Sequence, residues 1–144
     1  PAVPVAEFTR DELVAWGRAF GGRTAPGSVF TLAGELGAGK TTLVQAIAEG
    51  LGVRDEVTSP TYGIAHRYES PRGPVWHFDL YRLRSAAELP QVGLDDALRS
   101  GGVVLIEWPE VAESMLPRSR VAIRLEHVPG DVAKRRVHWT GVEA

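Results

Sequence analysis

The feature that most constrains the fold is a glycine-rich segment with the pattern Gly, four residues, then Gly-Lys-Ser/Thr. It occupies residues 34–41 and reads GELGAGKT. The apolar residues 29–32 before it predict a short buried strand, and residues 42–51 after it carry apolar side chains at helical spacing. Strand, glycine loop and helix in this order are typical of a phosphate-binding loop, and a chance match in a chain of this length is on the order of 0.5%.

The residue types in this loop suit the binding of a nucleoside triphosphate with a metal ion. Glycines let successive backbone N–H groups turn towards phosphate oxygens, and the following helix presents its positive end to them. We expect Lys40 to bridge the outer phosphates and the Thr41 hydroxyl to bind Mg²⁺. The predicted nucleotide contacts in this segment are Gly37, Ala38, Gly39, Lys40, Thr41 and Thr42.

Two acidic residues are candidates for the metal site and for hydrolysis. Residues 103–106 form the most apolar run of the chain and predict a buried, parallel strand that ends at Glu107. An acid at the carboxyl end of such a strand can face the loop, so Glu107 is predicted to hold Mg²⁺ together with Thr41. Asp79 could order the attacking water or support the metal, or could instead form a structural ion pair with Arg82.

The pattern around these residues predicts an α/β fold. Thr9 and Glu12 match a capping box before a helix over residues 10–20. Strands are expected at 62–69 and 75–80, short helices within 86–100, and an antiparallel pair in the tail. We therefore predict a P-loop NTPase-like, mainly parallel sheet flanked by helices and extended by antiparallel strands. The length of 144 residues favours a single ATPase domain over residues 1–144.

Composition excludes several classes of function. The chain has no cysteine, which excludes disulfides, thiolate zinc sites and thiol redox chemistry. Its net charge is −2, a poor basis for holding an RNA backbone, so any nucleic acid should be held by a partner. No apolar run approaches the roughly 20 residues of a membrane span. We expect a cytoplasmic protein that does not contact a membrane.

The rarity of lysine bears on the choice of nucleotide. Only Lys40 and Lys134 are lysines, so the Asn-Lys-x-Asp segment of guanine-specific switch proteins cannot be present, and adenine is favoured. The stretch around Thr9 and Arg10 is a candidate to cover the adenine, but no sequence pattern ties it to the loop. The basic run 134–136 is interpreted as charge that protects the edge of a tail strand, in preference to an RNA contact.

The glycine loop and four further blocks, in this order and spacing, resemble the bacterial TsaE (YjeE) family. The resemblance covers roughly residues 8–125. Any one block other than the loop would be weak, but together they are specific. The blocks are GELGAGKTT at 34–42, SPTY at 59–62, HFDLYR at 77–82, Glu88-Leu89 with Gly93 shortly after, and IEWPE at 106–110.

This resemblance implies a small Mg²⁺-dependent ATPase that serves the formation of threonylcarbamoyladenosine in tRNAs reading codons that begin with A. It implies hydrolysis of ATP to ADP and phosphate, and action on the TsaD–TsaB heterodimer, through which tRNA is contacted indirectly. We expect slow turnover by the chain alone, because no residue is clearly placed as an arginine finger. It also implies site roles. Lys40, Asp79, Glu107 and Thr61 would serve catalysis, Thr41 and Glu107 would hold Mg²⁺, and Trp108 would lie beside the nucleotide.

Two other functions remain open from the residues alone. A small-molecule kinase fits the size and the loop, with Arg82 and Arg84 as the dense basic residues that a lid requires. A nucleotide-gated binding module, in which the bound state matters and hydrolysis does not, fits the same loop.

Overall fold

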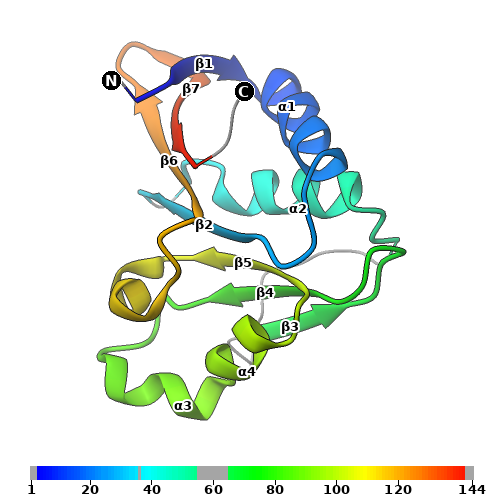
Figure 1. Ribbon diagram of the computed structural model, residues 1–144. Helices are drawn as coiled ribbons and strands as arrows, with labels where there is room; N and C mark the ends of the chain where they lie inside the picture. Colours follow the sequence, from blue (N-terminus) through cyan, green and yellow to red (C-terminus); the bar gives the residue numbers. More distant parts are fainter. Residues whose placement is uncertain (1–2, 36, 55–64, 142–144) are drawn as a thin grey trace.

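The computed structural model describes residues 3–35, 37–54 and 65–141. They form one seven-stranded sheet with helices on both faces (Figure 1), in the strand order β1-β7-β6-β2-β5-β4-β3. The strands are β1 (Val5–Thr9), β2 (Val29–Gly34), β3 (Ala65–Tyr68), β4 (Val75–Asp79), β5 (Val103–Glu107), β6 (Val121–Val128) and β7 (Asp131–Thr140). The helices are α1 (Arg10–Gly22), α2 (Lys40–Gly50), α3 (Leu89–Val92) and α4 (Leu94–Arg99), with 3-10 helices η1 (Ala86–Glu88) and η2 (Pro109–Met115).

The sheet confirms the predicted fold class. Its centre is parallel, because β2 pairs in parallel with both β5 and β6, and β4 pairs in parallel with β5. Its margins are antiparallel, with β3 on β4 at one side and β7 and β1 beyond β6 at the other. The tail strands are thus part of the main sheet: β6 lies directly beside β2, the strand that leads into the glycine loop.

Most of the predicted elements are present. The capping box at the start of α1 forms, since Thr9 N–H donates to Glu12 Oε1 (2.8 Å) and Glu12 N–H donates to Thr9 Oγ1 (3.3 Å). Strand β1 and helix η2 were not predicted. The predicted strand over 62–69 is described only from residue 65, as β3, and its first residues lie outside the described ranges. Within the described residues, no helix has both the length and the apolar character needed to span a bilayer.

Strand β5 explains how one sheet supports two cores. All five of its residues are buried. Val103 and Leu105 face the core beneath α1 and α2, and Val104 and Ile106 face the core that includes α4. A strand covered on both faces needs a continuous apolar run, which is the pattern seen in the sequence.

Helices α1 and α2 pack against each other (Figure 1). Gly21 of α1 lies directly against the backbone of α2. A Cβ atom at this position would lie 2.1 Å from the carbonyl oxygen of Ile47, so only glycine permits this approach. Because α2 begins directly after the glycine loop, the contact fixes the position of the helix that carries the site.

We expect Gly21→Ala to lower the free energy of unfolding by about 1–3 kcal/mol or more, because the added methyl group overlaps the Ile47 carbonyl. Gly22→Ala is the matched control in the same helical turn, where a Cβ would meet no atom within 4 Å. It should leave stability unchanged or raise it by up to about 1 kcal/mol. Equilibrium unfolding in urea measures both variants, and equal effects would contradict the close helix contact.

Candidate functional site

The glycine loop connects β2 to the N-terminus of α2 at the carboxyl edge of the parallel strands. Gly39 is the N-cap of α2 and has φ 101°, a left-handed conformation that favours glycine. Helix α2 then begins at Lys40, so its unpaired N–H groups and the positive end of its dipole lie at the loop. This local geometry suits an anion.

Lys40 is a buried cation at the centre of the loop, with 5% of its surface exposed. Its Nζ donates to the carbonyl oxygens of Gly34 (2.5 Å) and Glu35 (2.9 Å), which closes the loop around it. Desolvation lowers the pKa of Lys40, and the negative charges of Glu107 and Asp79 oppose that shift. An anion in the loop would therefore meet a cation that is already removed from water.

Glu107 lies at the end of β5, within hydrogen-bond reach of Thr41. Thr41 Oγ1 is 3.1 Å from Oε1 and 3.3 Å from Oε2 of this carboxylate, which is 2% exposed. The predicted metal-binding pair is therefore adjacent in space. Hydroxyl and carboxylate oxygens are ligands that Mg²⁺ prefers, and this metal usually takes one or two carboxylates and completes its shell with substrate phosphates and water. Within the described residues, no group of three or more His, Cys, Asp or Glu side chains could form a metal cage by itself.

Asp79 ends the neighbouring strand β4, where it is in register with Glu107 of β5. Its Oδ1 accepts a hydrogen bond from the Tyr81 N–H (3.1 Å). Desolvation raises the pKa of the Asp79 carboxyl, and the charge of Glu107 adds to the effect. In the described structure Asp79 does not pair with Arg82, so the structural ion pair weighed as an alternative is not formed.

Trp108 covers Lys40 from the side of β5. Its ring centroid lies 4.1 Å from Lys40 Nζ and 4.8 Å from the ring of Tyr81. Its backbone is left-handed (φ 55°), and it is the one non-glycine residue with positive φ in the described ranges. Such a conformation costs on the order of 1 kcal/mol or more and is typical of functional sites.

A cavity of about 360 Å³ joins these side chains. It is lined by eight residues that the sequence analysis singled out: Gly37, Gly39, Lys40, Thr41, Thr42, Asp79, Glu107 and Trp108. Ala38 does not line it, because its side chain is fully buried in the core. Thr61 and the rest of the predicted turn at 58–61 lie outside the described residues.

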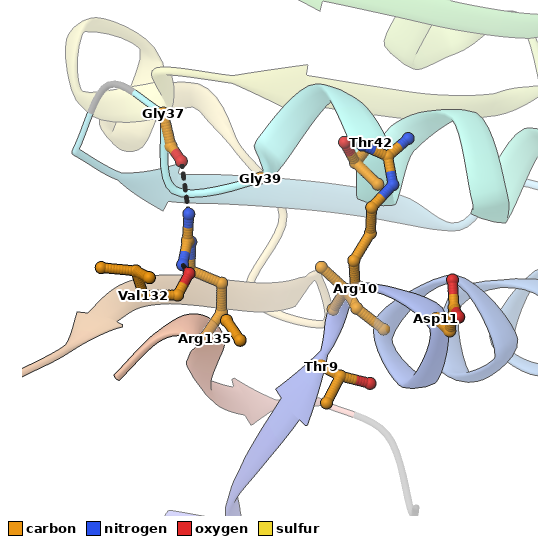
Figure 2. A pocket seen from close by; sticks show the side chains of 10 residues that line it. Thr9, Arg10, Asp11, Gly37, Gly39, Thr42, Val132 and Arg135 are labelled. Atoms are coloured by element: carbon orange, nitrogen blue, oxygen red, sulfur yellow. Dashed lines mark hydrogen bonds between the residues drawn. The ribbon is translucent and has the colours of Figure 1, made fainter. Parts of the chain in front are cut away.

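A second cavity, of about 520 Å³, adjoins the loop (Figure 2). It shares Gly37, Gly39 and Thr42 with the first. The remaining walls come from the start of α1 and from the β6–β7 hairpin: Thr9, Arg10, Asp11, Leu13, Val132, Ala133 and Arg135. Figure 2 shows Arg135 reaching the loop, where its Nη2 donates to the Gly37 carbonyl (3.3 Å).

Arg135 was missed by the sequence analysis, which interpreted residues 134–136 as charge on a sheet edge. That interpretation was wrong, because β7 lies inside the sheet between β1 and β6. The alternation of the tail strands could have shown that Arg135 and Arg136 face opposite sides. Only the pairing of β6 with β2 brings Arg135 to the loop.

Comparison with known proteins gives consistent matches. The family model described as threonylcarbamoyl adenosine biosynthesis protein TsaE matches residues 8–137. The tRNA threonylcarbamoyladenosine biosynthesis protein TsaE of Bacillus subtilis is 40% identical over 117 residues, which are 81% of this chain and 72% of that protein. The protein of the same description from Streptomyces coelicolor is 42% identical over 117 residues, 79% of this chain and 78% of its own length. The crystal structure of YdiB from Bacillus subtilis has a TM-score of 0.74 and 32% identity, and the match covers 99% of this chain and 89% of YdiB.

We expect Asp79→Asn to stabilise the protein at neutral pH in the absence of nucleotide and Mg²⁺. The folded-state pKa of the carboxyl is raised, so the wild-type charge costs stability as the pH rises from the ordinary value of 3.8 through the folded-state pKa. Below 3.8 that cost is absent. The gain should stay below about 1 kcal/mol, since the carboxyl is only half-buried.

Thermal unfolding of both proteins between about pH 3 and pH 7 measures this difference. The two stabilities should converge at the acidic end and separate as the pH rises. A difference that is constant with pH would show that the Asp79 charge is not its cause.

Proposed function

The chain belongs to the TsaE family of tRNA threonylcarbamoyladenosine biosynthesis proteins, and we propose that it serves this pathway as a Mg²⁺-dependent ATPase. The observation that carries the proposal is the cavity in which the glycine loop, the buried Lys40 and the acids of β4 and β5 converge. Hydrolysis of ATP to ADP and phosphate needs these groups: N–H donors and a cation for the phosphates, oxygen ligands for a metal, and an acceptor for a water proton.

Each part of the cavity has a proposed role. The N–H groups at the start of α2 and the ammonium of Lys40 bind the phosphates. Thr41 and Glu107 would hold Mg²⁺, which when bound offsets the charge on the outer phosphates. Asp79 orients the attacking water, and its raised pKa makes it a better proton acceptor than an exposed aspartate. We assign Thr61 to the same step from the family resemblance.

The second cavity is proposed to take the adenosine part of ATP. Its volume of about 520 Å³ suits a nucleoside, and it is continuous with the loop through Gly37 and Gly39. Val132 supplies apolar surface for a base, since it lines the cavity and is 94% exposed. Arg135 is positioned to contact the ribose or the phosphates.

Partners are proposed to complete the function. In the described part of the chain, Arg135 reaches the loop from the second cavity, and no arginine lines the cavity around Lys40. We propose that a partner supplies a further positive charge to the cavity around Lys40. We propose that the chain acts in the cytoplasm on the TsaD–TsaB heterodimer. Its net charge of −2 supports a division of labour in which these partners hold the tRNA.

The test of this proposal is steady-state ATP hydrolysis with Mg²⁺, by the chain alone and with TsaD–TsaB and tRNA added. We expect slow turnover alone and stimulation by the partners. Lys40→Ala should reduce the stimulated rate by about 100-fold or more, because it removes the cation from the loop. Lys134→Ala, the control at the one other lysine, should keep the wild-type rate.

Other outcomes identify the alternatives. Phosphorylation of a small-molecule acceptor would favour a kinase. Binding of ATP with no turnover under any condition would favour a nucleotide-gated module. Full activity of a folded Lys40→Ala protein would reject the assigned site.

The adenosine cavity yields a separate prediction. Arg135→Ala should weaken the binding of a fluorescent ATP analogue by about tenfold, because it removes a charged donor beside the loop. Arg136→Ala is the matched control, since Arg136 forms an ion pair with Glu7 (2.9 Å) and does not line the cavity. It should bind the analogue as the wild type does. Equal losses in the two variants would contradict the placement of the nucleoside.

A further inference from the structure

His77 is a fully buried polar residue that none of the proposed steps uses. It lies on β4 two residues before Asp79, so both side chains point to the same face of the sheet. Its exposure is 0%. The buried polar and charged residues of the described structure are Thr31, Lys40, His77 and Glu107, so His77 is one of very few polar groups kept in the core.

The imidazole makes one short hydrogen bond, to the predicted metal ligand. His77 Nε2 is 2.6 Å from Oε2 of Glu107. The other ring nitrogen, Nδ1, is buried and has no hydrogen-bond partner in the described part of the chain. His66, the residue opposite His77 on β3, bonds instead to the Tyr68 hydroxyl (3.0 Å).

This geometry assigns the proton of the ring. A carboxylate only accepts hydrogen bonds, so at 2.6 Å the nitrogen that faces it must carry a hydrogen. A proton on Nδ1 would be buried without an acceptor, and Nε2 would then set a lone pair against a carboxylate oxygen. The arrangement that fits the contact is a ring with its hydrogen on Nε2 donating to Glu107, with Nδ1 left without a partner.

The hydrogen bond from His77 distinguishes the two oxygens of Glu107, because it leaves Oε1 without a bond to the ring. His77 bonds to Oε2 alone, while the Thr41 hydroxyl lies within hydrogen-bond distance of both oxygens (3.1 Å to Oε1 and 3.3 Å to Oε2). A glutamate has one more rotatable bond than an aspartate, so its carboxylate needs a partner to stay in one orientation. His77 supplies that partner from the adjacent strand.

We propose that His77 is a positioning residue, whose Nε2–H holds Oε2 of the Glu107 carboxylate so that Oε1, the oxygen not bonded to the ring, is presented to Mg²⁺ beside Thr41. The inference rests on the proposed function of this site, in which Glu107 is a metal ligand. Hydrogen-bond partners of a metal ligand typically change metal affinity about 10- to 100-fold when they are removed.

The first test needs no active enzyme. Long-range ¹H–¹⁵N correlation spectra of the full chain, labelled with ¹⁵N-histidine and free of nucleotide, report the tautomer of each ring. The His77 signals are assigned by their loss in His77→Gln. We expect the Nε2–H tautomer for His77, and an Nδ1–H tautomer would overturn the proposal.

The second test measures the Mg²⁺ concentration that half-maximally tightens the binding of a fluorescent ATP analogue. His77→Leu fills the space without a donor and should require about 10- to 100-fold more Mg²⁺. His77→Gln places an amide N–H near the position of Nε2 and should recover most of this loss. His66→Gln is the matched control on the neighbouring strand and should behave as the wild type. With EDTA in place of Mg²⁺, all the proteins should bind the analogue equally.

The outcomes separate this inference from the proposed function. Wild-type protein that does not bind the analogue, or whose binding is insensitive to Mg²⁺, would contradict the ATPase proposal itself. A Mg²⁺-sensitive wild type with an unchanged requirement in His77→Leu would contradict the positioning role alone. His77→Asn, which is polar but too short to reach Glu107, repeats the test if the leucine variant does not fold. A wild-type Mg²⁺ requirement in that variant would also overturn the role.

Discussion

Lys40 and Glu107 are two opposite charges buried within the protein, and their need for hydrogen-bond partners restricts how the rest of the site can be arranged. A buried charge is strongly destabilising unless hydrogen bonds replace its water. Lys40 is satisfied by two carbonyls of its own loop, and Glu107 by Thr41 and His77. The loop, helix α2 and strands β4 and β5 must therefore keep one mutual arrangement, because a shift of any of them would leave a charge without its partner.

The order of the strands provides this arrangement. Parallel strands end at the same edge of a sheet, and β5 lies between β2 and β4. Glu107 is in register with Leu32 on one side and with Asp79 on the other. The glycine loop, the metal-ligand candidate and the second acid thus meet although they are far apart in the sequence. On the other side of β2, β6 brings its hairpin, and with it Arg135, against the same loop.

Local patterns were sufficient for some of these features and insufficient for others. The glycine loop, the capping box of α1 and the apolar run before Glu107 depend on residues close together in the sequence, and each could be predicted. The residues of strand β1 are exposed or half-exposed, so they form no apolar run. The strand forms because it pairs with β7, whose residues lie more than a hundred positions away. The roles of Arg135 and His77 also arise from strand pairing, so no local pattern predicts them.

Two unfavourable features of the structure lie at the same cavity. Asp79 keeps a charge that burial disfavours, and Trp108 keeps a left-handed backbone that a glycine would adopt more easily. Both residues line the cavity together with Lys40, and the ring of Trp108 contacts the Lys40 ammonium group. In the described ranges, no other non-glycine residue has a positive φ. Stability is thus lost at the positions where phosphates, metal and water would meet, as expected where a geometry is kept for chemistry at some cost to the folded state.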